Sequence, residues 1–137
     1  MKTQVTLTQE EQIQVAIDKG KKKFGKVYKT VIADEPIIWR KLKRVEYKEV
    51  MSIILYKEEP KLDENGNEIL DELGNVVMEQ VFDDEATYDL RQEEIAKAVI
   101  LYPNKDIVED MAAVADIIST ECMIKSGFGE TPKTEEC

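Results

Sequence analysis

The sequence has no histidine and only two cysteines, and these scarcities limit the chemistry open to the chain. Without histidine, a zinc site with mixed Cys and His ligands and a histidine-based acid–base pair are both excluded. Cys122 falls in an apolar helical pattern and Cys137 ends a polar tail, so the two are poorly placed for a disulfide framework. The glycine-rich motifs of phosphate-binding loops and nucleophile elbows are also missing. We therefore expect a protein that is not an enzyme and that has no cofactor, metal or catalytic residue.

Long apolar runs are missing too. No run approaches the roughly 18 apolar residues of a membrane span. The first residues, MKTQVTLTQEEQ, lack the apolar core of a signal peptide. We therefore expect a cytoplasmic protein that has no membrane partner.

Charge is what the sequence has in excess, and it is unevenly placed. The chain has a net charge of −10 over 137 residues. Residues 19–48 include 11 Lys/Arg and 3 Asp/Glu, whereas residues 58–94 include 2 Lys/Arg and 14 Asp/Glu. The basic run at 19–29 includes Phe24 and Tyr28, and such a mixture of lysines and aromatic residues is also found on RNA-binding surfaces. The overall acidic charge argues against a nucleic-acid partner. The two charged regions could attract each other within the fold or meet different partners.

The N-terminal part of the chain predicts a short helix followed by a β-hairpin. Residues 1–25 form an N-terminal segment, in which Thr8 and Glu11 fit a capping box and Gly20 ends the helix. Alternating, β-branched residues predict strands at 26–33 and 37–42, joined by a turn at 34–36. The register of this hairpin is left open by the sequence.

Three longer helices are predicted after the hairpin. The first covers residues 43–59 and stops at Pro60, and the second covers 83–102 with Asp83 or Asp84 as its N-cap. The last runs from residue 105 to a glycine, Gly127, in the left-handed position beyond its end. The predicted fold class is α+β and mostly helical: an N-terminal β-hairpin and a small helical bundle with an acidic hairpin or loop insertion. It would be a single domain over 26–129, with the insertion at about 60–82 and a disordered tail at 130–137.

The acidic stretch contains a near-repeat, DENGNEIL followed by DELGNVVM. A calcium loop requires glycine at position 6 and glutamate at position 12. Counted from Asp63 or from Asp71, glycine falls at position 4, and position 12 is Gly74 or Phe82. The calcium interpretation therefore fails in both registers. Asn65-Gly66 is a strong turn pair, so the stretch is a flexible acidic loop or a marginally stable hairpin.

Three motifs occur in a fixed order along the chain: IIWRKLKRVEYKEVM, RQEEIAKAVILYP and IISTECMIKSGFG. In this order they resemble the entry into the first long helix, the second helix and the closing helix of small bacteriophage tail assembly chaperones. The resemblance covers residues 26 to about 129 and treats the acidic stretch as a spacer of free length.

The resemblance implies a non-catalytic role in virion morphogenesis. Such chaperones coat the helical tape measure protein before the tail tube polymerises around it, in the cytoplasm of the infected bacterial host, and are usually absent from the virion. Some relatives act in baseplate assembly, so a baseplate or tail-tip subunit retained in the virion is the first alternative. The second is a small acidic regulator that binds a basic partner. A homo-oligomer is also compatible with the resemblance.

The last predicted helix has a wide, methionine-containing apolar face, which suits either a core or a groove for a partner helix. The predicted partner-binding residues lie on or beside this face. They are Tyr102, Met111, Val114, Ile118, Met123 and Phe128.

Overall fold

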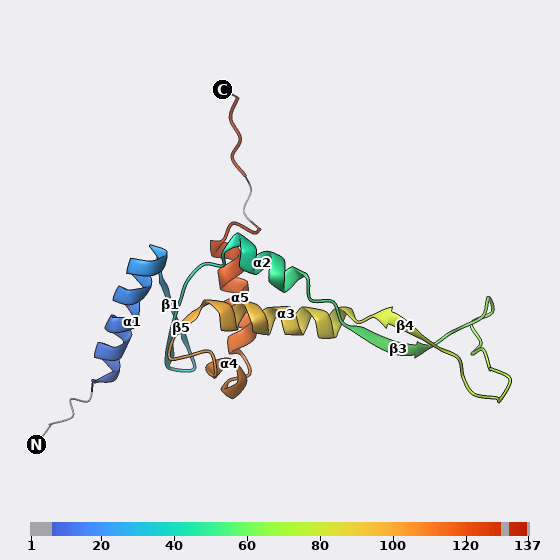
Figure 1. Cartoon of the computed structure of the whole chain (residues 1–137). Coiled ribbons are helices and arrows are strands. Elements are labelled where there is room, and N and C mark those ends of the chain that lie inside the picture. Colours follow the sequence, from blue (N-terminus) through green and yellow to red (C-terminus); the bar gives the residue numbers. More distant parts are fainter. Residues whose placement is uncertain (1–6, 130–131, 137) are drawn as a thin grey trace, which may run out of the picture.

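A computed structural model describes residues 7–129 and 132–136. Predictions for residues 1–6, and for residues 130, 131 and Cys137 of the tail, lie outside the described residues. The fold is α+β, with helices and strands interleaved along the chain (Figure 1). The elements are α1 Gln9–Phe24, β1 Tyr28–Ile32, β2 Glu35–Trp39, α2 Arg44–Met51, β3 Tyr56–Pro60, β4 Met78–Phe82, α3 Asp84–Val99, β5 Ile100–Tyr102, α4 Ile107–Asp110 and α5 Val114–Lys125.

The capping box at the start of α1 is confirmed, but the predicted end of this helix is wrong. The Glu11 amide donates to Thr8 Oγ1 at 3.2 Å, and Glu11 Oε1 accepts the Thr8 amide at 3.5 Å. The helix passes through Gly20 and ends before Gly25, whose φ is 85°. Gly20 is buried, and a Cβ there would lie 2.6 Å from Val27 Cγ1. Gly20 therefore permits close packing of the helix rather than ending it.

The predicted β-hairpin is present, with its turn placed earlier than expected. Ala33 and Asp34 both have positive φ, 48° and 64°, and Ile32 pairs with Glu35. A two-residue loop with two positive φ values matches the right-handed twist of the strands. The predicted turn at 34–36 is therefore wrong, because Glu35 and Pro36 already belong to β2.

The structure also supplies the register that the sequence left open. Tyr28 pairs with Trp39, and their rings stack with centroids 4.7 Å apart. Trp39 Nε1 donates to Thr30 Oγ1 at 2.9 Å, so the buried indole N–H has a partner. β5 adds on the other side of β2 and gives the antiparallel order β1-β2-β5.

All three predicted long helices are interrupted. The first ends at Met51, and residues 56–60 form β3 because they find a partner strand, β4, about twenty residues later. The second ends at Val99, and residues 100–102 leave it to pair with β2. The last is divided into α4 and α5, because Met111 has an extended backbone with φ −127° and ψ 113°.

β3 and β4 form a two-stranded arm that projects away from the body of the molecule (Figure 1). The two strands contact mainly each other. The base of the arm is fixed to α3: the Leu55 amide donates to Thr87 Oγ1 at 3.0 Å, and the Asp83 amide donates to the Leu55 carbonyl at 2.9 Å. The direction of the arm is therefore set by the helix that follows it.

The near-repeat at the tip of the arm consists of two copies of one loop. Asp63 accepts two backbone N–H groups on Oδ1, those of Asn65 and Asn67, each at 2.9 Å. Asp71 does the same eight residues later, with the N–H groups of Leu73 and Asn75, again at 2.9 Å. This local bonding is the Asx-turn chemistry for which Asp is favoured in turns.

Three residues spaced by eight close the tip with a ring of backbone hydrogen bonds. The Lys61 amide donates to the Val77 carbonyl, the Val77 amide to the Ile69 carbonyl, and the Ile69 amide to the Lys61 carbonyl. The three distances are 2.8, 2.8 and 3.1 Å. The eight-residue period of the sequence is therefore a structural period, in which the arm and its two loops meet at one junction.

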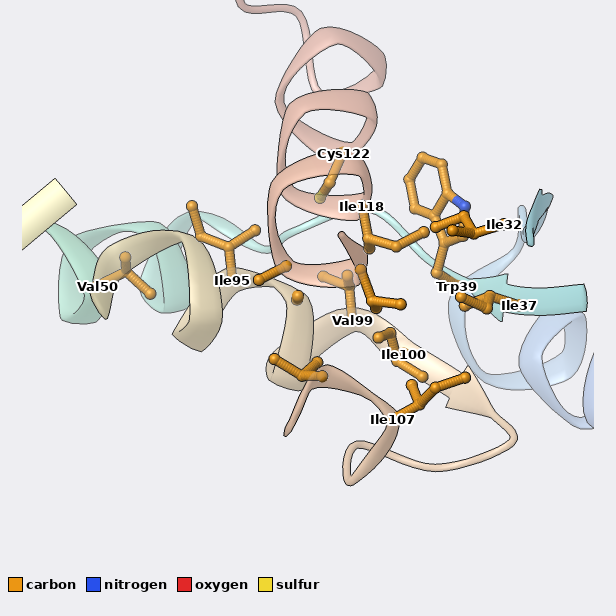
Figure 2. Close-up of a cluster of buried hydrophobic side chains, with 14 residues drawn as sticks. Ile32, Ile37, Trp39, Val50, Ile95, Val99, Ile100, Ile107, Ile118 and Cys122 are labelled. Atoms are coloured by element: carbon orange, nitrogen blue, oxygen red, sulfur yellow. The ribbon is translucent and has the colours of Figure 1, made fainter. Parts of the chain in front are cut away.

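The hydrophobic core lies between the sheet and the helices α3, α4 and α5 (Figure 2). Ile37, Val99, Val114, Ile118 and Cys122 are fully buried there. Ile38 is equally buried but stands outside this cluster, as expected for the opposite face of β2, where α1 packs. The sheet is therefore covered on both faces, and the functional surface must be sought on the helices.

Candidate functional site

An apolar groove opens between α2, α3 and α5, on the surface of the body. Its volume is about 430 Å³. Its lining is mostly apolar side chains with a few polar groups between them. The residues are Met51, Tyr88, Arg91, Gln92, Ile95, Ser119, Thr120, Met123, Ile124, Phe128 and Gly129.

Helical spacing brings the two long walls of the groove together. On α3, Tyr88, Arg91 and Ile95 lie three and four residues apart and therefore share one face. On α5, Thr120 and Ile124 share a face in the same way. α3 and α5 make the most extensive helix–helix contact of the fold, so these two faces form adjoining walls.

Arg91 ties the third wall to α3. Its guanidinium donates to the Ile53 carbonyl at 2.8 and 3.1 Å and to the Met51 carbonyl at 3.0 Å. These carbonyls lie at the C-terminal end of α2, where a helix leaves backbone acceptors unpaired and favours a cation. Arg91 therefore fixes α2 beside the groove and leaves its own charge largely neutralised by backbone dipoles.

The end of α5 turns back to close the groove. The Gly127 amide donates to the Ile124 carbonyl at 3.1 Å, and the Phe128 amide donates to the Met123 carbonyl at 3.0 Å. This pair of bonds is a Schellman motif, and Gly127 has the positive φ that it requires, 101°. The Phe128 ring stacks on Tyr47 of α2, with centroids 5.0 Å apart. The predicted left-handed position of Gly127 beyond this helix end is confirmed.

The six predicted partner-binding residues divide into three groups. Met123 and Phe128 line the groove. Val114 and Ile118 are 0% exposed, so they are core residues that a partner cannot reach in this structure. Tyr102 pairs with Ile38 in the sheet, and Met111 packs partly buried against the core.

Sequence reasoning missed most of the groove, because its wall on α3 gives no clear apolar signal. Met51, Tyr88, Ile95 and Ile124 complete the apolar lining. Residues 88, 91, 92 and 95 have the i, i+3, i+4, i+7 spacing of one helix face, but Arg91 and Gln92 are polar, so this face is not an apolar stripe. Only the packing of the helices shows that these residues line one groove.

A charged pair lies at the opposite end of α2. Arg40 Nη1 and Nη2 donate to the two Glu46 carboxylate oxygens at 2.6 and 2.7 Å, and Nη2 also donates to the Ala98 carbonyl at 2.8 Å. The hydrogen bond from Arg40 lowers the pKa of Glu46 from its ordinary value. The pair joins α2 to α3 and is structural in character.

Cys122 is the other chemically distinctive group of the body. It is fully buried against the Arg40 carbonyl, and burial raises the pKa of its thiol. A thiol with a raised pKa stays protonated near neutral pH, so Cys122 lacks the thiolate that nucleophilic or metal-binding cysteines need.

Residues 7–129 and 132–136 contain no cluster of three or more Asp, Glu or Cys side chains placed to hold a metal ion. In the same part of the chain, none of the helices combines the length and apolar character needed to cross a membrane. The two aspartates of the repeat are engaged otherwise, since Asp63 and Asp71 each accept amides of their own loop.

Comparisons with protein-family models, with curated proteins and with solved structures found no match for this chain.

Proposed function

We propose that this protein is a bacteriophage tail assembly chaperone that holds an apolar helix of a tape measure protein in the groove between α2, α3 and α5. The observation that carries the proposal is the groove itself. Ile124 and Phe128, both in its lining, are 45% and 40% exposed, so the groove presents apolar surface to the solvent. The order of motifs shared with tail assembly chaperones supports the same function.

The lining suits a partner helix of variable sequence. Met51 and Met123 are unbranched and adaptable, and such side chains fit different apolar ridges without a fixed complementary shape. A helix docks in a groove of this kind through residues at i, i+3, i+4 and i+7. The acidic surface of the chain would keep the resulting complex dispersed by charge repulsion. In this proposal the protein acts without catalysis, in the cytoplasm of the infected host, and leaves before the virion is complete.

A charge placed in the groove tests the proposal. Ile124→Asp puts a carboxylate on an exposed groove position, and Val15→Asp makes the same kind of change at a similarly exposed position, 39%, on α1. Each variant is co-expressed with the candidate tape measure protein, and the soluble complex is quantified by co-purification. We expect Val15→Asp to retain the complex. Ile124→Asp should weaken the affinity for the tape measure protein about tenfold or more, which corresponds to about 1.4 kcal/mol of binding free energy.

Two outcomes would contradict this function. One is an insoluble tape measure protein that fails to co-purify with the unchanged chain. The other is an equal loss of complex in both variants. Thermal unfolding of both variants checks that neither has lost its fold.

The projecting arm favours a second function, a baseplate or tail-tip subunit that stays in the particle. The two strands of the arm contact mainly each other, so the arm can reach neighbouring subunits in an assembly. Mass spectrometry of purified virions distinguishes the two functions, because a chaperone should be missing from the virion and a subunit should be present in a fixed copy number.

A further inference from the structure

The tip of the arm is an apolar projection surrounded by carboxylates. Leu73 is 86% exposed and Leu70 59% exposed, which makes Leu73 the most exposed of the large apolar side chains that the structure describes. Glu64, Glu68 and Glu72 are exposed on the same two loops. From residue 56 to residue 82 the chain has eight acidic and two basic residues. The two Asp-centred loops hold this tip in one conformation, which lowers the entropic cost of docking it.

A cavity of about 390 Å³ at the C-terminal end of α1 has the complementary character. Its apolar residues are Phe24 and Leu42, and lysines surround them. The full lining is Lys23, Phe24, Gly25, Lys26, Lys41, Leu42 and Lys43. Among residues 7–129 and 132–136, none of these lysines forms a salt bridge. The ammonium groups of Lys23 and Lys43 lie 5.4 and 5.2 Å from the centre of the Phe24 ring.

The arm and the cavity of one chain lie too far apart to meet. Figure 1 shows α1 and the arm on opposite sides of the body, with the sheet, α3 and α5 between them. The arm cannot bend back freely, because Leu55 is hydrogen-bonded to Thr87 and Asp83 at its base. The charge complementarity of the two features can therefore be satisfied only between two molecules.

We propose that the arm tip of one copy docks in the lysine-lined cavity of a second copy. Leu73 enters between Phe24 and Leu42, and Glu64, Glu68 and Glu72 face the surrounding lysines. The contact joins two different surfaces, so it is heterologous, and repeated head to tail it builds an open chain, or a ring where the rotation between copies closes. It uses none of the residues that line the apolar groove and does not depend on the function proposed above.

Charge reversal of the full-length chain tests the contact. One variant carries Glu64→Lys, Glu68→Lys and Glu72→Lys, a second carries Lys23→Glu, Lys26→Glu and Lys41→Glu, and a third carries all six changes. Sedimentation velocity is measured over a range of protein concentrations at about 50 mM and about 0.5 M salt, since screening weakens such pairs. We expect the unchanged chain to associate at low salt, each triple variant to be monomeric, and the sixfold variant to associate again.

A matched control reverses three exposed carboxylates of the body, Glu49, Asp89 and Glu93, and should leave association unchanged. Ile124→Asp, which tests the groove, should also leave it unchanged, so failure of one proposal is distinguishable from failure of the other. A monomeric unchanged chain at all concentrations would overturn the contact, as would association that survives either triple reversal. A monomeric chain whose cavity binds a single-stranded oligonucleotide would instead assign the lysines to a polyanion.

Discussion

The body and the arm of this protein are held together by different forces. In the body, side chains such as Ile37, Val99 and Ile118 are completely removed from water, and burial supplies the stability. In the arm, from residue 56 to residue 82, no residue is buried. Order there depends on the backbone ladder, on the Asp-centred loops and on the attachment to Thr87. A two-stranded hairpin alone is marginal in water, so the arm depends on the body for its order, and the body does not depend on the arm.

The free energy of unfolding should distinguish the body from the arm most clearly when an apolar side chain is shortened in each of them. Ile118→Ala removes a fully buried side chain and should lower the free energy of unfolding by about 2–5 kcal/mol. Leu73→Ala removes an exposed one and should change it by less than about 0.5 kcal/mol. Chemical denaturation at high salt, where the chain is expected to be monomeric, measures both. Similar losses in the two variants would mean that the arm is part of the cooperative core.

This contrast also explains what the sequence could predict. Some local signals were reliable: the Thr8–Glu11 capping box, the cap at Asp83 and the glycine at 127 are confirmed, because each depends on residues that are close in the chain. Others were not, since the helix end at Gly20 and the turn at 34–36 are both wrong. The ends of the long helices were not predictable. Residues 56–60 and 100–102 become strands through partners far along the sequence, and such pairing overrides helical periodicity.

The residues that line the groove were only partly predictable, for a related reason. Val114 and Ile118 belong to the wide apolar face of α5, and periodicity assigns such a face equally to a core or to a groove. Which residues of α5 are buried depends on where α2 and α3 pack, and that packing is set by tertiary contacts. The break at Met111 was missed too, because neither glycine nor proline marks it in the sequence.

The Arg40–Glu46 pair should make the body, and not the arm, sensitive to acid. Because the pKa of Glu46 is lowered in the folded protein, its contribution is fully present above the ordinary value of 4.5 and is lost as the pH falls through the lower folded pKa. Glu46→Gln should cost on the order of 1–2 kcal/mol near neutral pH, less than a fully buried pair, because the side chain is 21% exposed. Urea unfolding between neutral and acidic pH measures this.

Glu49→Gln is the control for that change, since Glu49 is exposed on the same helix. It should leave the pH dependence as it is in the unchanged chain. If Glu46→Gln unfolds with an unaltered pH profile below 4.5, the acid sensitivity has another source.

Removing the hydrogen bond at the base of the arm should destabilise the arm more than the body. Thr87 is 1% exposed, and its hydroxyl oxygen accepts the Leu55 amide. Thr87→Val leaves that half-buried Leu55 donor unpaired and should cost about 1 kcal/mol. Hydrogen exchange should accelerate more in β3 and β4 than in α3 and α5. Thr87→Ser keeps the oxygen and should keep most of the protection, and exchange that rises equally in both regions would show that the arm is not attached through this bond.

The smallest effect on global stability should come from the glycine of the second tip loop. Gly74 has a φ of 81°, and a Cβ added there would meet no atom within 4 Å, so alanine causes backbone strain without a steric clash. Gly74→Ala should lower the free energy of local opening of this loop by about 1 kcal/mol, the penalty for a left-handed non-glycine residue. Because no buried side chain depends on this loop, the strain should raise amide exchange from residue 71 to residue 77 and leave the unfolding temperature unchanged. A lowered unfolding temperature would show that order in the tip reaches the core, and the separation of arm and body would then be wrong.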